Sequence, residues 1–175
     1  GSLCPFCAGK RVSRTNSLAI QFPEIAAEWH PTENGDLTPA DVVAGSGKKA
    51  WWKCDAGTDH EWSTTVASRT RGNGCAFCAG QRASTTNSLE ALFPEVAAEW
   101  HPTKNGDLTS ADVPGGSGNS HWWKCDVADD HEWRARVAHR TRTTAPRVGC
   151  PACAGKQVST TNRLDLQFPE IATQW

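Results

Sequence analysis

The stretch WWKCDAGTDHEW occupies residues 51–62, and the chain repeats it as WWKCDVADDHEW at residues 122–133. Both copies hold three tryptophans, one cysteine and one histidine at the same spacing, in a chain that has no tyrosine and no methionine. Self-similarity at a fixed interval is typical of repeat proteins, in which each copy forms the same structural element. The chain should therefore contain a small module, used at least twice, whose fold depends on these side chains.

Two further elements occur three times each. One contains a CxxC pair, as in CPFCAGKRVS, and the other contains Phe-Pro-Glu, as in NSLAIQFPEIAAEW. The CxxC elements begin at residues 4, 75 and 150, and the Phe-Pro-Glu elements begin at residues 16, 87 and 162. RTRGNGC at 69–75 returns lengthened as RTRTTAPRVGC at 140–150, and this insertion indicates a tolerant surface loop.

These intervals divide the chain into two full repeats and two partial ones. We expect full repeats at 16–86 and 87–161, with the end of a preceding repeat at 1–15 and the start of a following one at 162–175. Gly1-Ser2 reads as the remnant of a removed tag. A repeat of this size buries only a small core, so we expect an additional staple.

The cysteines are the candidates for that staple. The chain has eight of them, an even number that also allows disulfides. However, a full repeat holds three cysteines, so pairing within it would leave one over, and a histidine repeats with them. Structural zinc sites commonly use three cysteines and one histidine. We therefore predict two zinc ions, with the ligand sets Cys54, His60, Cys75, Cys78 and Cys125, His131, Cys150, Cys153.

The spacing of these ligands supports the zinc prediction. Within each ligand pair the spacing is the same in both repeats, while the connector between the pairs varies. A metal site requires this, because each pair wraps one side of the ion. Cys4 and Cys7 form only half of such a site, and reduced thiols, oxidation and ligands from another molecule all remain open for them.

The remaining histidines are not expected to bind metal. His121 and His139 align with alanine and serine in the other repeat, so neither is a general ligand. His30 and His101 do repeat, but they lie far upstream of the cysteines. We expect them to cap or pack at a helix end.

Local signals predict a short helix and a helical turn at the start of each repeat. FPEIAAEW places a proline and a glutamate where the first turn of a helix favours them. Thr38 and Asp41 resemble a capping box in which aspartate replaces glutamate. Each repeat should therefore be a small α+β module, with these helical segments beside a β-hairpin.

The hairpin is predicted from GSGKKAWWKC, a loop entering a strand, and from a period-two alternation that starts at Trp62. Trp62 and Val66 should face the core, while Arg69 and Arg71 continue the opposite face if the alternation slips at its end. We expect the tryptophans to form the core, and the cysteine and histidine to close a zinc knuckle between the two strands.

The repeated pattern WWKC…HEW…RTR…GC(A/P)xC, preceded by FPE(I/V)AAEWHPT(E/K)NGDLT, resembles the zinc-ribbon repeat family of bacterial and viral proteins. The resemblance covers nearly all of residues 3–175 and implies tandem treble-clef-like or zinc-ribbon-like modules. Such modules occur beside restriction-like or homing-type nuclease domains, which implies DNA binding. Ala76 departs from the family, whose knuckle usually has proline as at Pro5 and Pro151, and this change should not disturb ligation.

The charge distribution agrees in part with DNA binding. The formal net charge is −1, which argues against a simple electrostatic clamp on DNA. However, residues 134–163 contain six arginines and one lysine and no acidic residue. We predict a basic face that contacts phosphate and could read guanine, although such a face can also be merely solvated. Its candidate residues are Arg69, Arg71, Arg82, Arg134, Arg136, Arg140, Arg142, Arg147 and Lys156, with Arg69, Arg71, Arg140 and Arg142 as first choices.

No catalytic motif is recognisable. Glu61 and Glu132 directly follow a histidine, which is the wrong spacing for a zinc deaminase, and four protein ligands would close the metal to substrate. We therefore expect a monomeric, cytoplasmic, non-catalytic module, nucleoid-associated when bound to DNA, with no membrane association. Duplex DNA is the expected partner, with single strands and RNA open. The alternatives are a protein-interaction scaffold and an accessory module of a fused or associated nuclease domain.

Overall fold

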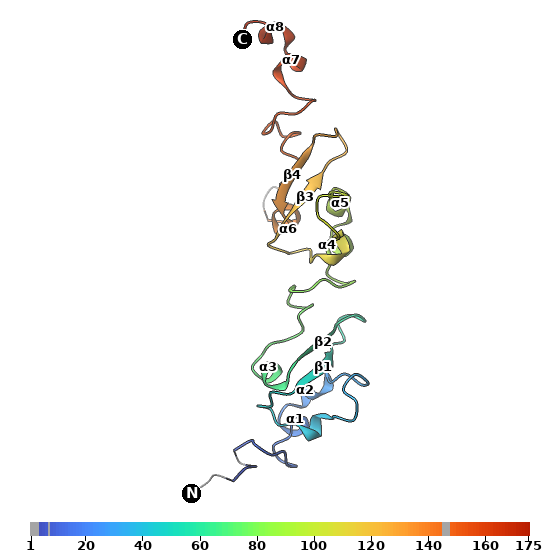
Figure 1. Cartoon of the computed structure of the whole chain (residues 1–175), viewed down its shortest axis with the longest axis vertical. Helices are drawn as coiled ribbons and strands as arrows, with labels where there is room; N and C mark the ends of the chain where they lie inside the picture. Colours follow the sequence, from blue (N-terminus) through green and yellow to red (C-terminus); the bar gives the residue numbers. More distant parts are fainter. Residues whose placement is uncertain (1–3, 7, 145–147) are drawn as a thin grey trace. The chain divides into compact units, whose positions relative to one another are not determined.

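The computed structural model describes residues 4–6, 8–144 and 148–175, and these residues form two compact units. Unit 1 is Gly1–Ala79 and unit 2 is Gly80–Trp175. Each unit places short helices around a two-stranded antiparallel hairpin (Figure 1). The predicted small α+β fold is confirmed. The repeat bounds at 86 and 87 follow sequence similarity rather than compactness and stay a prediction.

The same succession of six elements opens both units, and unit 2 adds two further helices (Figure 1). Unit 1 contains α1 (Leu18–Gln21), α2 (Pro23–Ala27), the 3-10 turn η1 (Pro39–Asp41), β1 (Lys49–Lys53), β2 (Glu61–Thr65) and α3 (Val66–Thr70). Unit 2 contains α4 (Leu89–Leu92), α5 (Pro94–Ala97), η2 (Ser110–Asp112), β3 (Ser120–Lys124), β4 (Glu132–Arg136), α6 (Val137–Thr141), α7 (Leu164–Gln167) and α8 (Pro169–Ala172). Within the described residues, no helix has the length and apolar character that crossing a membrane requires.

The inner face of each hairpin forms the centre of the core. In unit 1, Trp52 lies opposite Trp62 across the β1–β2 ladder, and both side chains are buried. In unit 2, Trp123 and Trp133 form the same pair across β3–β4. The apolar clusters of the two units gather around these pairs. The predicted core role is confirmed for these four tryptophans.

The outer face of each hairpin carries a tryptophan as well. Because successive strand residues point to opposite faces, Trp51 faces away from the core and is 41% exposed. Trp122 occupies the same position in unit 2 and is half-buried. The expectation that the tryptophans belong to the core is therefore wrong for Trp51, and also for Trp175, which is fully exposed.

The helical signals read from the sequence are confirmed. Helices α2 and α5 begin with a proline at their first position, where the missing N–H costs nothing. The 3-10 turn η1 has the capping box of Thr38 and Asp41, and η2 repeats it with Thr109 and Asp112. These turns fix the segment that leads into each hairpin.

The strand after each zinc knuckle ends earlier than its alternation suggests. β2 ends at Thr65, whose hydroxyl accepts a hydrogen bond from the Ser68 backbone N–H at 3.2 Å and caps α3. From Val66 the chain is helical, so Arg69, three residues on, shares the inward face of Val66. The prediction that the strand alternation continues to Arg69 is therefore wrong, because the chain is helical from Val66 onward.

Candidate metal centre

In unit 1, the four predicted ligands lie together in one cluster. Cys54 directly follows β1 and His60 directly precedes β2, so the knuckle between the two strands supplies one ligand pair. The CxxC turn after α3 supplies Cys75 and Cys78. Nδ1 of His60 lies 3.4 Å from the Cys54 sulfur, 3.7 Å from that of Cys75 and 3.5 Å from that of Cys78.

Unit 2 repeats this arrangement. Nδ1 of His131 lies 3.4 Å from the Cys125 sulfur, 3.6 Å from that of Cys150 and 3.4 Å from that of Cys153. The Cys125 and Cys153 sulfurs are 3.8 Å apart. Among the described residues, these two clusters are the groups of three or more potential ligands close enough to share an ion.

These distances match the edges of a zinc tetrahedron. Zinc–sulfur bonds of about 2.3 Å and zinc–nitrogen bonds of about 2.0 Å, at tetrahedral angles, separate two sulfurs by about 3.8 Å and a sulfur from a nitrogen by about 3.5 Å. A disulfide needs sulfurs about 2.05 Å apart, and the 3.6 Å between Cys54 and Cys78 excludes one there. The two predicted Cys3His sites are confirmed, and each fits one zinc ion.

In the absence of a metal ion, the thiols favour their protonated form. Burial, together with the neighbouring thiols of Cys75 and Cys78, raises the pKa of the Cys54 thiol to about 12. Burial also raises the pKa of the Cys125 thiol above its usual value. Three sulfurs this close would repel one another as thiolates, so a metal that binds them must displace protons and supply positive charge.

The ring of His131 is held from its far side. Its Nε2 lies 3.1 Å from the hydroxyl of Ser159 and 2.9 Å from that of Thr161. With Nδ1 facing the sulfurs, the Nε2–H donates to these hydroxyls and fixes the tautomer that binds metal. Sequence reasoning missed both residues, although the repeated S-x-T-N after each CxxC element is the signal that could have found them.

The packing around the two ligand histidines differs. In unit 1, the His60 ring stacks on Phe77, with centroids 5.0 Å apart and the planes 16° from parallel. A Cβ atom on Gly57 would come within 2.6 Å of the His60 ring. In unit 2, the corresponding positions are both alanine, at residues 128 and 152.

Cys4 lies at an exposed position, and Cys7 lies outside the described residues. The predicted half-site therefore stays a prediction. His30 and His101 agree with their expected role. The Nδ1 of His30 accepts hydrogen bonds from the Thr32 and Glu33 backbone N–H groups at 3.3 and 3.2 Å, which closes the turn that follows α2.

Two of the predicted nucleic-acid residues are core residues. Arg69 is 5% exposed. The carbon of its guanidinium lies 5.3 Å from the ring centroid of Trp52 and 5.4 Å from that of Trp62. The same guanidinium forms an ion pair with Glu28 at 2.5 Å.

Arg140 repeats this arrangement in unit 2. It is 3% exposed, lies 4.8 Å from the Trp123 ring centroid and pairs with Glu99 at 2.6 Å. Buried cations engaged in this way cannot reach a phosphate without breaking the core. The prediction that Arg69 and Arg140 contact nucleic acid is corrected.

The other predicted cations lie mainly on the surface. Arg134 and Arg136 project from the outer face of β4 and are exposed, because the strand alternation holds through residue 136. The remaining exposed candidates are Arg71, Arg82, Arg142 and Lys156. Arg147 lies outside the described residues.

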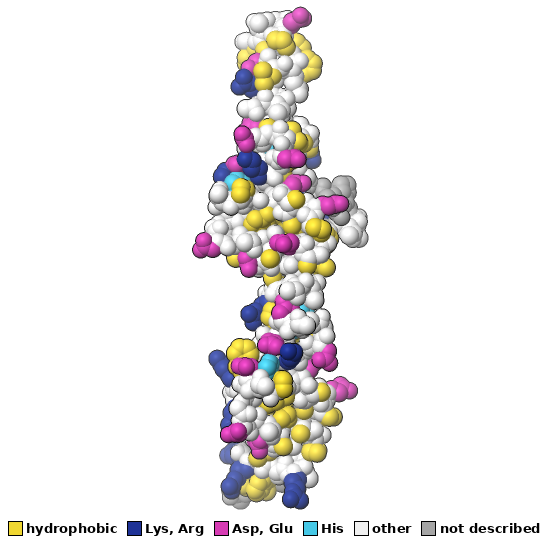
Figure 2. Space-filling view, turned by 90° about the vertical axis from the view of Figure 1, so that its right-hand side faces the viewer, with side chains coloured by type: hydrophobic (Ala, Val, Ile, Leu, Met, Phe, Trp, Pro, Cys, Tyr) yellow, Lys and Arg dark blue, Asp and Glu magenta, His cyan; other side chains and the backbone are white. Residues whose placement is uncertain are grey.

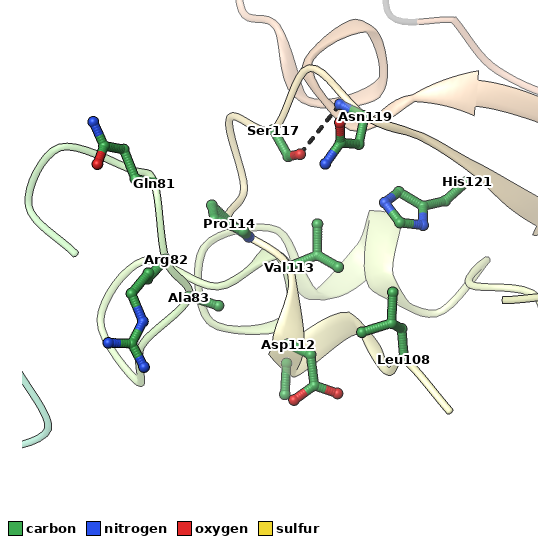
Figure 3. Close-up of a pocket in the computed structure, with 11 residues that line it drawn as sticks. Gln81, Arg82, Ala83, Leu108, Asp112, Val113, Pro114, Ser117, Asn119 and His121 are labelled. Atoms are coloured by element: carbon green, nitrogen blue, oxygen red, sulfur yellow. Dashed lines mark hydrogen bonds between the residues drawn. The ribbon is translucent and has the colours of Figure 1, made fainter. Parts of the chain in front are cut away.

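Arg82 also lines a shallow pocket of about 430 Å³ within unit 2 (Figure 3). The opposite wall includes Asn119 and His121, and the His121 ring packs 4.7 Å from the ring of Trp100. Burial and the charge of Arg134 lower the pKa of His121. Neither zinc cluster contributes to this pocket, so we assign it no chemistry.

A closed Cys3His cluster on a hairpin knuckle and a CxxC turn defines the chain as a zinc-finger protein. The family model described as "Probable Treble clef zinc finger domain" matches residues 25–81 and 96–156, and each match contains one complete ligand set. The chain belongs to this family and carries two of its domains in tandem. A search of curated proteins gave no significant match.

Proposed function

We propose that the chain is a non-catalytic zinc-finger module that binds DNA through exposed cationic side chains, chiefly Arg134 and Arg136. Their placement carries this proposal. Both side chains are exposed, they lie two residues apart on β4, and they pair across the ladder with Trp122 and Ser120. Strand alternation puts both on one face, and the zinc knuckle anchors the hairpin that holds them.

The charge around these arginines supports the same proposal. Glu132, the acidic residue on the same face, already pairs with Lys104 and lies 2.8 Å from His101. Lys104 and His101 lower the pKa of Glu132 to about 2, so its charge is held by these partners. Among the described residues, Arg136 forms no ion pair, which leaves its charge available to a phosphate.

Unit 1 carries exposed cations of its own that could contact DNA. Figure 2 shows several Lys and Arg side chains along one edge of unit 1, whose exposed cations include Lys48, Lys49 and Arg71. Exposed arginines and lysines bind phosphate regardless of sequence, and an arginine in the major groove of a duplex can read guanine. The expected duplex preference and any base specificity belong to this proposal.

The geometry of the zinc clusters favours a non-catalytic role. Catalytic zinc keeps a coordination position open for water, whereas structural zinc has four protein ligands. Both clusters offer four ligand atoms at tetrahedral separations. The zinc would therefore stabilise the fold and hold the hairpin, while the exposed side chains contact the partner.

The exchange Arg134→Ser with Arg136→Thr tests the proposal, because it gives unit 2 the residues that unit 1 has at positions 63 and 65. We expect weaker binding to duplex DNA at low salt. The slope of log affinity against log salt should fall by about 0.9 for each arginine that contacts a phosphate. Fluorescence anisotropy over a salt series measures both quantities.

Arg163→Ser is the control. It removes one positive charge, compared with two in the double variant, from an exposed arginine that pairs with Asp165 outside the hairpin. Equal affinity and equal salt slopes for the double variant and this control would overturn the proposal and favour the protein-interaction scaffold.

A further inference from the structure

Trp51 is an exposed aromatic side chain in the middle of a cationic strand. It lies on the outer face of β1, with Lys49 and Lys53 on the same face two residues before and after it. Its neighbour Trp52 is fully buried and accounts for the packing of this strand. The ring of Trp51 therefore does not pack in the core, although both repeats have a tryptophan at this position.

The backbone of Trp51 is clamped at the edge of β1 that faces away from β2. The Asn34 side chain accepts a hydrogen bond from the Trp51 backbone N–H at 2.8 Å and donates one to its carbonyl at 2.9 Å. The His30 backbone N–H donates to the same carbonyl at 3.0 Å. The turn closed by His30 thus brings Asn34 to the strand, and the outward ring has a fixed base.

The same clamp exists in unit 2. Asn105 accepts from the Trp122 backbone N–H at 2.9 Å and donates to its carbonyl at 3.0 Å. Cations flank this second ring, with the Lys104 ammonium 4.8 Å and the Arg134 guanidinium 6.0 Å from its centroid. An aromatic ring on a clamped strand backbone, beside positive charge, is therefore a repeated feature of the outer hairpin face.

We propose that Trp51 and Trp122 are platforms on which unpaired nucleobases of single-stranded DNA or RNA stack. This inference rests on the proposed function and adds single-stranded nucleic acid to the duplex as a second ligand. Non-specific single-strand binding combines an aromatic ring for the base with cations for the backbone. Lys49 beside Trp51 and Arg134 beside Trp122 provide the second part, whereas Lys53 and Lys104 already pair with Glu61 and Glu132.

An unpaired base fits these rings better than a base pair. In a duplex, neighbouring pairs cover both faces of each base, so a side chain at the surface meets phosphates and base edges. A single strand offers a free π-face that any base can present, so the interaction tolerates sequence. Because Lys104 and Arg134 lie over Trp122 in the free protein, the more open Trp51 should contribute more.

The test compares Trp51→Phe with Trp51→Thr, and Trp122→Phe with Trp122→Thr, because threonine suits an exposed strand position and phenylalanine keeps a ring. The probes are fluorescein-labelled oligo(dT), oligo(rU) and a DNA duplex. We expect each threonine variant to bind oligo(dT) roughly 5- to 100-fold more weakly, with the phenylalanine variants in between. Duplex binding should change far less. Comparison of oligo(dT) with oligo(rU) identifies the sugar that the chain prefers.

Ile20→Ala is the control for loss of an exposed apolar side chain, since Ile20 in α1 is 63% exposed. Zinc content and the thermal transition must match the parent protein in every variant. Threonine variants that bind oligo(dT) like the control would overturn the platform, and the proposed function would stand if Arg134→Ser with Arg136→Thr still weakened DNA binding. Absence of DNA and RNA binding by the parent chain would overturn both.

Discussion

The two ligand histidines have the same metal-facing geometry but different surroundings. His60 stacks on Phe77 and leaves no space for a side chain on Gly57. In unit 2, the smaller Ala152 replaces the phenylalanine, and Ala128 replaces the glycine. A large and a missing side chain in one unit thus correspond to two small ones in the other. The arrangement of the four ligand atoms is therefore the same in both units, whereas the side chains packed against the histidine differ.

The outer hairpin faces differ more freely than the zinc centres. Ser63 and Thr65 of β2 correspond to Arg134 and Arg136 of β4, with no change in strand register. Inside the core, the Arg–Glu pair and the two tryptophans are the same in both units. Substitutions at the surface are free to alter binding, whereas those around the metal and the arginine must compensate one another.

Loss of a metal ligand should have the largest effect on either unit. Cys75→Ser and Cys150→Ser remove equivalent buried ligands, and we expect each variant to retain one zinc ion and unfold the unit that lost its site. Structural zinc contributes about 10–16 kcal/mol to the folding of small fingers, which exceeds what a small core supplies. Native mass spectrometry counts the ions, and near-ultraviolet circular dichroism reports the packing of the tryptophans.

Cys4→Ser is the control, because Cys4 lies outside both clusters. A Cys75→Ser protein that kept two zinc ions would contradict the assigned ligands. Loss of both ions would show that the two centres are not independent.

The buried arginines should give the next largest effect. We expect Arg69→Ala and Arg140→Ala each to lower the free energy of unfolding by about 2–4 kcal/mol, because Glu28 or Glu99 loses its partner and two rings lose a cation. Lysine should not restore the loss, since it cannot place a planar group between the rings. Urea denaturation followed by tryptophan fluorescence measures these changes.

Arg71→Ala and Arg142→Ala remove exposed arginines two residues further along and should change stability by no more than about 0.5 kcal/mol. Equal losses for the buried and the exposed pairs would contradict the core role. The result also bears on the proposed DNA binding, because under that proposal a destabilised Arg140→Ala variant would bind less DNA without having lost a contact.

These arginines show where prediction from the sequence stops. The zinc ligands could be predicted because a metal demands particular atoms, and constant spacings reveal them. Whether Arg69 is buried or exposed depends on whether the chain after Thr65 stays extended, and the sequence VASRT is compatible with both a strand and a short helix. Tertiary packing against the tryptophans decides between them. The hydrogen bonds between Asn34 and the Trp51 backbone join residues that are 17 positions apart, and no local sequence pattern predicts them.

The exchange around the histidines can be tested by rebuilding one centre as the other. Gly57→Ala should cost about 1–3 kcal/mol, because the new Cβ would overlap the His60 ring. Phe77→Ala alone leaves a cavity and should cost about 3–5 kcal/mol. The double variant reproduces the pair found in unit 2 and should be more stable than the sum of the two losses predicts, by about 1 kcal/mol. Additive losses in chemical denaturation would show that the two positions do not compensate.

The smallest difference between the units concerns their capping boxes. Hydrogen bonds from the Thr38 hydroxyl and backbone N–H lower the pKa of Asp41, and Thr109 does the same for Asp112. A carboxylate whose pKa is lowered by folding stabilises the fold above its unfolded pKa, near 4, and this contribution is lost as the pH falls through the lowered value. Both turns should therefore loosen only in acid.

Asp41→Asn and Asp112→Asn should remove this pH dependence, but by different amounts in the two units. η1 begins with Pro39, whose ring already fixes the backbone, whereas η2 begins with Ser110, which has no such restriction. We expect the amide of Thr109 to lose more protection in Asp112→Asn than the amide of Thr38 loses in Asp41→Asn. Hydrogen exchange measured by NMR at pH values below and above about 4 resolves the two amides. Equal losses would mean that the proline adds nothing to η1, and a larger loss at Thr38 would reverse the comparison.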